Sequence, residues 1–231
     1  MDSRITGYHQ TFEQNSTTAL SHTVDTVKPE TFEPHLVRGV SIKPPFPEPM
    51  QQAIFGMGCF WGAEKIFWSR PGIYVTAVGY SGGTVPQPDY PQVCQGDSGH
   101  AEVVLVVFDP DHISFHKLLT LFWENHDPTQ GNRQGNDIGS QYRSVIYTFD
   151  DQQRQLAIQS RQDYTKVLEH ANYPGITTEI KAAGEFFYAE SYHQQYLIKN
   201  PQGYCVHTST GIRCPHTARP FTPNSGDPIA P

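Results

Sequence analysis

The amino-acid sequence predicts a single domain of the α+β class, with a mixed central β-sheet and helices packed on it. Segments typical of strands and of helices alternate between residues 50 and 216, but without the regular βαβ rhythm of a doubly wound fold. A chain of 231 residues is long enough for one large core with tails. Residues 1–49 and 217–231 are polar and rich in proline, so we expect an extended N-terminal arm and a flexible C-terminal tail.

Short apolar runs bounded by turn residues predict the strands of this sheet. The run AEVVLVVF at 101–108 has the highest content of β-branched residues and is the most strand-like segment of the chain. The predicted strands span 53–55, 73–80, 101–108, 144–149, 177–180 and 185–188.

Helices are predicted between these strands. In SFHKLLTLFWENHDP the apolar residues follow helical spacing behind Ser114, a suitable N-cap. Asp150 or Asp151 is expected to cap a long polar helix, and the Gly- and Pro-rich stretch 81–99 is expected to be a loop. The predicted helices span 64–68, 115–127, 151–170 and 190–199.

The charge balance argues against two classes of partner. The chain has 16 Lys+Arg against 23 Asp+Glu and a formal net charge of -7, so we expect no nucleic acid and no membrane among its partners. The N-terminus has no basic segment followed by an apolar stretch, and no apolar run reaches the roughly 18 residues of a membrane span. We therefore expect a cytoplasmic protein, and nothing in the pattern requires more than a monomer.

Cys59 lies in the stretch AIFGMGCFWGAEKIFW, after an apolar run and before a predicted helix. At a helix start, unpaired backbone N–H groups and the positive end of the dipole favour the thiolate, which is the nucleophilic form. A thiol with a pKa of about 8.5 is only a few per cent ionised at neutral pH, so stabilisation of the thiolate by the helix start would increase its reactivity. The pattern fits a small buried residue in a tight turn equally well, and both interpretations remain open.

Glu102 begins the most strand-like segment. Alternation places it on one face with Val104 and Val106, while the other face is also apolar, so its carboxyl group can lie at the mouth of a buried strand. Burial there would raise the pKa and keep the acid protonated, ready to donate a proton. The alternative is an exposed glutamate at a strand end.

Three further polar residues lie in predicted loops. Tyr90 in QPDYPQVC and Tyr142 in NDIGSQYRS are in segments with proline or glycine, where site residues often occur. Each tyrosine is equally consistent with ordinary half-buried packing. Asp137 can organise its loop or act as a turn or cap residue.

The four cysteines, Cys59, Cys94, Cys205 and Cys214, are too few for a disulfide framework in a chain of this length. Cys205 and Cys214, with His207 and His216, have the residue types of a zinc site, although their spacing is not that of a zinc finger. A mobile dithiol segment that reaches another thiol fits the same two cysteines. Metal binding and redox chemistry therefore both remain open at this end of the chain.

Six motifs together resemble one known family. The motifs GCFWGAE, GYSGG, GDSGHAEVV, FWENHDPTQGNRQGNDIGSQYRS, HQQYL and NPQGYC occur between about residue 54 and Cys214. Their order and intervals are similar to those of methionine sulfoxide reductase A. The resemblance implies a ferredoxin-like two-layer sandwich and a catalytic domain at 50–216 that includes the C-terminal cysteines.

The resemblance also implies roles for the residues around the reacting oxygen. Cys59 matches the nucleophile that attacks the sulfoxide sulfur, and Glu102 matches the acid that protonates the sulfoxide oxygen. Tyr90 and Tyr142 match hydroxyl groups that hydrogen-bond this oxygen. Asp137 matches a carboxylate that helps to arrange the site.

The remaining matches concern the floor of the site and the thiol relay. Phe60 and Trp61 match an aromatic floor that accepts the ε-methyl group of the substrate. Cys205 matches a resolving cysteine that forms a disulfide with Cys59, and Cys214 matches a recycling cysteine that exchanges to give a Cys205–Cys214 disulfide. Family members with this pair tend to have a glycine-rich stretch between the two, whereas VHTSTGIR keeps one glycine, so we expect a stiffer segment. Cys94 has no such role and is expected to be structural.

In activity, the resemblance implies a peptide-methionine (S)-S-oxide reductase that repairs proteins under oxidative stress. Such an enzyme reduces the S epimer of methionine sulfoxide, free or in proteins, through a cysteine sulfenic acid, and thioredoxin restores its thiols. Neither a metal nor an organic cofactor is implied. The alternative from another class is a noncatalytic protein that binds oxidised methionine or carries zinc.

Overall fold

The computed structural model describes residues 31–204 and 208–215. The predicted tail at 217–231 and residues 1–30 of the predicted arm lie outside the described residues. The strands are β1 (Gln51–Met57), β2 (Ile73–Ser81), β3 (Ala101–Phe108), β4 (Arg133–Gln134), β5 (Asp137–Ile138), β6 (Ser144–Thr148), β7 (Glu179–Ala182) and β8 (Phe186–Tyr188). The helices are α1 (Phe60–Trp68), α2 (Tyr90–Gln95), α3 (Phe115–Glu124), α4 (Asp151–His170), α5 (Tyr196–Lys199) and the 3-10 helix η1 (Ser140–Tyr142).

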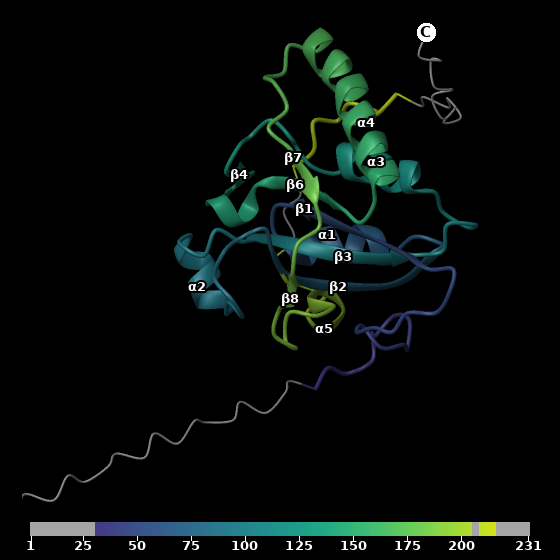
Figure 1. The fold of residues 1–231 in the computed structure, drawn as a ribbon. Helices are drawn as coiled ribbons and strands as arrows, with labels where there is room; N and C mark the ends of the chain where they lie inside the picture. Colours follow the sequence, from purple (N-terminus) through teal and green to yellow (C-terminus); the bar gives the residue numbers. More distant parts are fainter. Residues whose placement is uncertain (1–30, 205–207, 216–231) are drawn as a thin grey trace, which may run out of the picture.

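One mixed sheet forms the centre of the molecule (Figure 1). Its six strands follow the order β7-β6-β1-β3-β2-β8, while β4 and β5 form a separate hairpin. The pair β6–β7 is parallel, and the other pairs in the sheet are antiparallel. The predicted α+β class with a mixed central sheet is confirmed.

The helices α1, α3 and α4 cover one face of this sheet (Figure 1). Alternation along β3 places Val104 and Val106 in the core beneath the helices, and Val103 and Leu105 in a second core on the opposite face. Glu102 shares the parity of Val104, so its side chain lies on the helical face, at the end of the strand nearest to α1. The sheet and its helices thus form the two layers that the resemblance implies.

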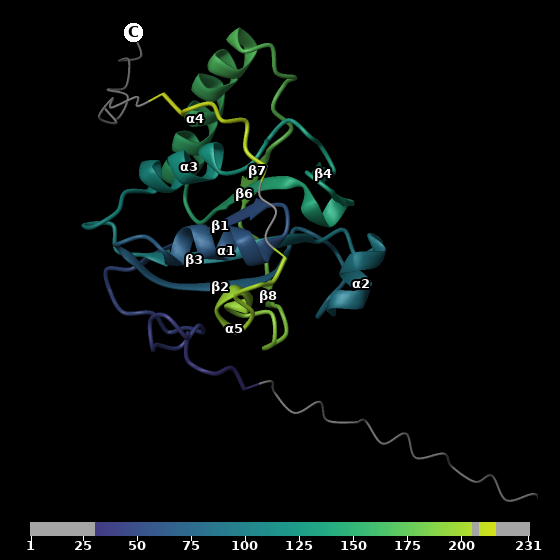
Figure 2. The same ribbon diagram turned by 180° about the vertical axis from the view of Figure 1, so that it is seen from behind.

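The described part of the predicted N-terminal arm lies against the opposite face. Ile42 is buried in the second core, and Phe32 and Phe46 pack beside it. Tyr188 of β8 donates a hydrogen bond from its hydroxyl to the carbonyl of Ile42. Figure 2 shows this purple segment running beside β2 and β8, so the apolar side chains of that face are partly covered by chain from before β1.

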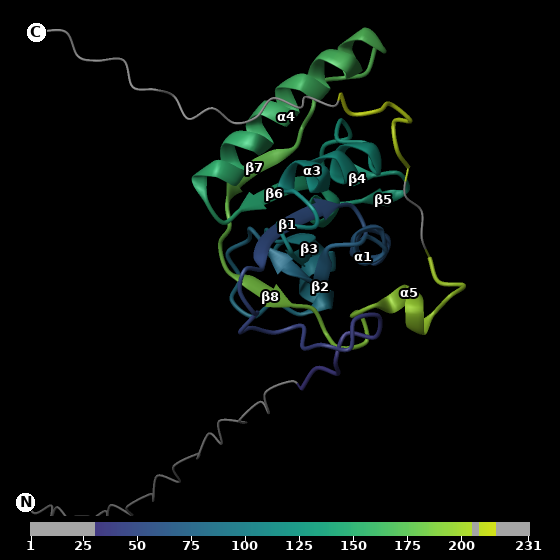
Figure 3. The same ribbon diagram turned by 90° about the vertical axis from the view of Figure 1, so that its right-hand side faces the viewer.

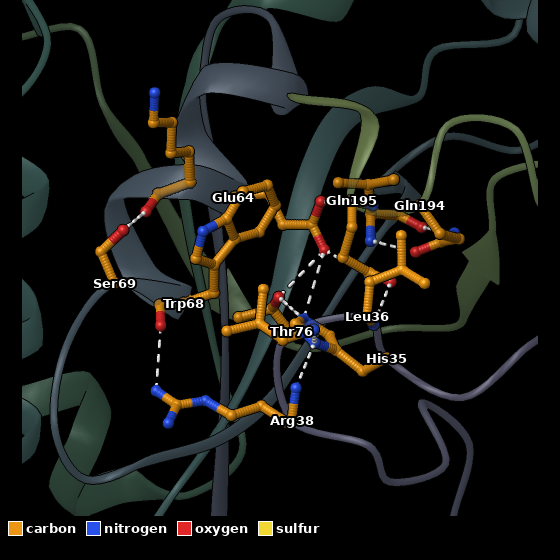
Figure 4. A network of polar contacts seen from close by, with 12 residues as sticks. His35, Leu36, Arg38, Glu64, Trp68, Ser69, Thr76, Gln194 and Gln195 are labelled. Atoms are coloured by element: carbon orange, nitrogen blue, oxygen red, sulfur yellow. Dashed lines mark hydrogen bonds and ion pairs between the residues drawn. The ribbon is translucent and has the colours of Figure 1, made fainter. Parts of the chain in front are cut away.

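A buried polar network joins this N-terminal segment to α1 (Figure 4). Glu64 of α1 is fully buried and accepts a hydrogen bond of 2.9 Å from the hydroxyl of Thr76 in β2. The ring of His35 lies 2.9 Å from the same hydroxyl. Gln195 donates to Glu64 from its backbone N–H at 2.9 Å and from its side-chain amide at 2.8 Å. The carboxylate therefore ties three distant segments to the helix, which fixes the position of α1 on the sheet.

Helix caps agree with the sequence where a side chain supplies them. Ser114 accepts the backbone N–H of Lys117 at the start of α3, and Asp150, rather than Asp151, accepts that of Gln153 at the start of α4. The predicted helix at 190–199 is wrong over its first part, because regular helix is confined to α5. Gln195 immediately before α5 has a φ of 48°, a left-handed conformation that an α-helix cannot continue through.

The stretch 81–99, predicted to be a loop, contains α2. Asp89 caps this short helix by accepting the N–H of Gln92, whose side chain in turn accepts the N–H of Asp89. This reciprocal capping box and the proline that follows it are sequence signals of a helix start. Across residues 31–204 and 208–215, no helix has the length and apolar character needed to cross a membrane.

Candidate active site

A pocket of about 140 Å³ brings together residues from five separate parts of the chain. It lies beside the N-terminal end of α1, on the helical face of the sheet. All the catalytic and substrate-binding residues predicted from the sequence line it, together with one residue that was not predicted, Tyr204. The lining residues are Cys59, Phe60, Trp61, Tyr90, Glu102, Asp137, Tyr142 and Tyr204.

Cys59 is the N-cap residue of α1, directly after a tight turn from β1. Gly58 permits this turn because its φ is 88°, a conformation that residues with a Cβ rarely adopt. A Cβ at Gly58 would also lie 2.6 Å from the side chain of Gln134. Glycine at this position therefore allows the strand to end and the helix to begin within two residues, with the thiol at the junction.

The protonation of Cys59 differs from the sequence-based expectation. Burial raises the pKa of the Cys59 thiol well above its usual value, and Glu102 raises it further once its carboxyl group ionises. The backbone N–H groups of Trp61 and Gly62 act in the expected direction and lower it, but they are outweighed. The helix N-terminus is present as predicted, yet the thiol is protonated in the pocket because it lies in a water-poor environment beside an acid.

Glu102 is a buried acid, only 2 % exposed. The alternative of an exposed glutamate at a strand end is therefore wrong. One carboxyl oxygen, Oε2, accepts the backbone N–H of Phe60 at 3.0 Å. Burial raises the pKa of Glu102 to about 8, the Phe60 N–H opposes this rise, and the charge of Asp137 adds to it. The direction of this shift and its main cause, burial, are those expected from the sequence.

The two predicted tyrosines reach the pocket from different elements. Tyr90 is the first residue of α2, and its backbone N–H donates to Glu190 at 2.8 Å. Tyr142 ends η1. Burial raises the pKa of both hydroxyl groups above the usual range, and a hydrogen bond to Cys94 adds to the rise for Tyr90, so each hydroxyl carries its proton. The Tyr90 hydroxyl would have to turn from Cys94 to donate into the pocket.

Asp137 and Tyr204 are joined across the pocket. The Tyr204 hydroxyl donates a hydrogen bond of 3.0 Å to Oδ1 of Asp137, which lies in the β4–β5 hairpin. Tyr204 belongs to the motif NPQGYC, and its position directly before a cysteine was the signal that could have identified it. The hairpin was not predicted either, because its strands have two residues each and carry no apolar alternation.

Phe60 and Trp61 form one wall of the pocket at the start of α1. Phe60 is 1 % exposed, and its ring lies 5.9 Å from that of Tyr80. The Trp61 indole stacks on Tyr196 with 3.9 Å between ring centroids and 13° between planes. Figure 3 shows α5, which begins with Tyr196, on the same side of the sheet as α1. The pair presents the apolar surface expected of a floor for a methyl group.

Of the two predicted C-terminal thiols, the structure describes Cys214 and not Cys205. Cys205 lies outside the described residues, but Tyr204 before it is bonded to Asp137, and Thr208 donates to Gln134 at 3.1 Å. Asp137 and Gln134 are paired residues of one hairpin. The chain on both sides of Cys205 is therefore attached to the hairpin that lines the pocket.

Cys214 lies apart from the pocket, buried against α3 and α4. Its backbone N–H donates to Glu124 at 2.9 Å, and the hydroxyl of Tyr164 donates to the carbonyl of Ile212 at 3.0 Å. Burial raises the pKa of the Cys214 thiol to about 12. Figure 2 shows the yellow segment 208–215 alongside α3 and α4. This part of the C-terminal segment is docked, in agreement with the stiffer character expected from VHTSTGIR.

The zinc alternative cannot be built from the described residues. Of its four candidate ligands, Cys205, His207 and His216 lie outside them, and only Cys214 is described. In the part of the chain that the structure describes, no group of three or more Cys, His, Asp or Glu side chains could hold a metal ion. Cys94 is a free and exposed thiol, and its sulfur accepts a hydrogen bond from the Tyr90 hydroxyl, so it contributes little to the core.

Together the fold and the pocket define an enzyme of the oxidoreductase class, with a cysteine, a buried acid and hydroxyl groups at one small cavity. The family model described as "Peptide methionine sulfoxide reductase" matches residues 51–221. The chain belongs to the peptide methionine sulfoxide reductase family.

Individual relatives agree with this assignment. The chain is 60% identical over 181 residues to peptide methionine sulfoxide reductase MsrA of Brucella anthropi, covering 78% of this chain and 83% of the relative. It is 58% identical over 183 residues to the enzyme of the same name in Methylococcus capsulatus, covering 79% and 82%. Among solved structures, methionine sulfoxide reductase A of Corynebacterium diphtheriae matches with 46% identity and a TM-score of 0.72, covering 80% and 89%. Mxr1 of Saccharomyces cerevisiae in reduced form matches with 34% identity and a TM-score of 0.62, covering 69% and 91%.

Proposed function

We propose that this chain reduces methionine-S-sulfoxide, free and in proteins, to methionine, as a repair and antioxidant enzyme that uses thioredoxin. One observation carries the proposal. Cys59 shares a pocket with Glu102, an acid that burial keeps protonated near neutral pH, and with two protonated tyrosine hydroxyls. A sulfoxide oxygen needs a proton before it can leave, and these are the groups that supply or orient one.

In the first step, the sulfur of Cys59 attacks the sulfoxide sulfur while Glu102 donates its proton to the sulfoxide oxygen. The thiol proton passes to the carboxylate that Glu102 has become, so the acid is restored. The oxygen is transferred to Cys59, which becomes a sulfenic acid, and methionine is released. The methionine sulfur gains two electrons and the Cys59 sulfur loses two. Proton return to Glu102 explains how a thiol with a raised pKa can act as the nucleophile.

Tyr90 and Tyr142 donate hydrogen bonds to the sulfoxide oxygen, and Asp137 holds Tyr204 at the edge of the pocket. Phe60 and Trp61 contact the ε-methyl group. The small volume of the cavity, about 140 Å³, supports this assignment, because it admits the end of a methionine side chain and excludes a large ligand.

In the second step, the Cys205 thiol attacks the sulfenic sulfur of Cys59, a disulfide forms and water leaves. Attachment of Tyr204 and Thr208 to the pocket hairpin supports this choice, because the described residues on both sides of the segment that contains Cys205 are held at the pocket. Cys214 then exchanges with this disulfide to give Cys205–Cys214, and the dithiol of thioredoxin reduces it. Since Cys214 is buried and protonated, the exchange requires segment 208–215 to leave α4 first.

We further propose a cytoplasmic monomer that needs no metal or organic cofactor, because the steps above use only protein thiols and protons. The net charge of -7 is consistent with partners that are neither nucleic acids nor acidic membranes.

Separated S and R epimers of a blocked methionine sulfoxide test the proposal, each with a thioredoxin regenerating system or with dithiothreitol. We expect turnover of the S epimer with both reductants and no turnover of the R epimer, and we expect Cys59→Ser to abolish it. Turnover with dithiothreitol but not with thioredoxin would support reduction by Cys59 and contradict the proposed thiol relay to thioredoxin. No turnover with either reductant would favour the noncatalytic binding protein.

A further inference from the structure

His193 is a buried residue that contacts three of the residues lining the pocket. Its ring lies 5.1 Å from that of Phe60, 5.7 Å from that of Trp61 and 4.5 Å from that of Tyr90, measured between centroids. The residue is 1 % exposed. It is not among the residues that line the cavity, and it packs against three residues that are.

One of these contacts is directional. The indole Nε1 of Trp61 donates a hydrogen bond of 3.0 Å to Nδ1 of His193. An acceptor at Nδ1 places the ring proton on Nε2, and Nε2 has no hydrogen-bond partner. The nearest acid is Glu190, whose Oε2 lies 3.8 Å away, beyond hydrogen-bond distance. The ring thus leaves one buried polar atom unpaired while its other nitrogen holds Trp61.

The charge state of the ring is consistent with this arrangement. Burial lowers the pKa of His193 to about 4, although Glu190 acts in the opposite direction. A protonated ring would carry hydrogen on both nitrogens, and Nδ1 could no longer accept from the indole. The bond to Trp61 therefore requires the neutral imidazole, and the environment provides it.

The segment that carries His193 is itself held firmly by its next two residues. Gln194 accepts the N–H of Val78 at 2.9 Å and donates to the carbonyls of Val78 and Ala189, both at 2.8 Å. Gln195 makes the two bonds to Glu64 of α1 described above. Figure 4 shows Gln195 and Thr76 converging on Glu64.

Glu64 and Trp61 are three residues apart, so they project from neighbouring positions on one side of α1. The helix and the 193–195 segment are therefore joined at two points, Trp61 to His193 and Glu64 to Gln195. The bond between Glu64 and Gln195 fixes the backbone next to His193. The bond between His193 and Trp61 then restricts the position of the indole.

We propose that His193 is a positioning residue that fixes the Trp61 indole in the wall of the pocket through an acceptor at Nδ1, and so determines how tightly the substrate methyl group is held. This rests on the proposed function for the role of Trp61. Each of the first four residues of the motif HQQYL (193–197) then has a structural role. The histidine positions the Trp61 indole, the two glutamines hold the segment in place, and the tyrosine stacks on the indole.

Two amide substitutions of His193 distinguish the effect of the hydrogen-bond acceptor at Nδ1 from the effect of losing the aromatic ring. In His193→Asn the side-chain amide takes the place of Nδ1 and can still accept from the indole, whereas in His193→Gln it reaches the place of Nε2. Both variants lose the aromatic contacts equally, so their difference reports the bond to Trp61. The first readout is the indole Nε1–H signal of Trp61 in ¹⁵N-labelled protein, assigned with Trp61→Phe. The second is single-turnover release of methionine as a function of sulfoxide concentration.

We expect the Trp61 indole signal of His193→Asn to stay near its wild-type position and that of His193→Gln to shift. The half-saturating sulfoxide concentration should be higher in His193→Gln than in His193→Asn, by up to about fivefold, since the net worth of one hydrogen bond limits how far its loss can disorder the floor. The limiting rates should agree within about twofold, because the floor holds substrate and transition state alike. Identical indole signals or identical half-saturating concentrations in the two variants would overturn the proposal.

A measurement on the unsubstituted chain covers the case in which His193→Gln does not fold. Long-range ¹H–¹⁵N correlation of the histidine rings should find His193 neutral, with its proton on Nε2 and a hydrogen-bonded Nδ1. A proton on Nδ1 would overturn the proposal without any variant. Failure of the proposed function appears separately, as absence of methionine release from the wild-type chain, and leaves both spectroscopic results interpretable.

Discussion

Ionisation of Glu102 should make the folded protein less stable as the pH rises. The pKa of this carboxyl is 4.5 in its unperturbed state and is raised to about 8 in the fold, chiefly by burial. A group whose pKa is raised on folding contributes its full stability below the unfolded value, and this contribution is lost as the pH rises through the folded value. The relevant window for Glu102 therefore lies between pH 4.5 and about pH 8.

The size of the effect follows from the difference in bound protons. Between pH 5 and pH 7 the folded state keeps the proton on Glu102 and the unfolded state has released it. Each pH unit then lowers the free energy of unfolding by about 1.4 kcal/mol, which gives about 2 to 3 kcal/mol over this interval. Glu64 adds a similar contribution of its own, because burial raises its pKa to about 7.

Comparison with Glu102→Gln isolates the contribution of Glu102, since Gln has the same shape, can accept the Phe60 N–H and does not ionise. Urea unfolding of both chains at pH 5 and pH 7 provides the free energies. We expect the wild-type chain to lose about 2 kcal/mol more than the variant over this interval. Equal losses in the two chains would refute the assignment of Glu102 as a buried acid that is neutral near pH 7.

Three further predictions concern the reaction. Glu102→Gln should retain part of the activity and Glu102→Ala should lose most of it, because an amide can still hydrogen-bond the sulfoxide oxygen; wild-type rates in both would contradict the acid role. Cys205→Ser should release about one equivalent of methionine and then stop in the presence of thioredoxin, whereas repeated turnover would mean that another thiol resolves the sulfenic acid. Cys214→Ser should recycle more slowly with thioredoxin, and an unchanged steady-state rate would place Cys214 outside the relay.

Much of the central sheet could be predicted from the sequence because its strands are buried on both faces. The prediction for β3 matches the structure at both ends, since a run such as AEVVLVVF has no favourable exposed conformation. The start of α4 was also predictable to within one residue, with Asp150 or Asp151 as its cap, because a capping side chain is a local signal. These features depend on neighbouring residues, which a single sequence displays directly.

Features that depend on distant contacts could not be obtained in the same way. The pKa of Cys59 is set by burial and by Glu102, and neither is visible in the turn that precedes α1. The contact of His193 with Trp61 cannot be predicted from the sequence, because nothing around a lone histidine indicates a tryptophan partner 132 residues away. Local arguments singled out Cys59 and Glu102 as candidates but left their alternatives open, and Phe60 and Trp61 were predicted from the family resemblance alone.

The network at Glu64 places a constraint on how this sequence can change over time. Replacing Glu64 alone would strand the N–H and amide of Gln195 and the hydroxyl of Thr76 without their acceptor. Each stranded group costs about 1 to 3 kcal/mol, while joint replacement by apolar residues of similar shape can be nearly neutral. Single substitutions at positions 64, 76 and 195 should therefore be selected against, whereas joint substitutions should be tolerated. We expect these three positions, distant in the sequence, to change together in evolution.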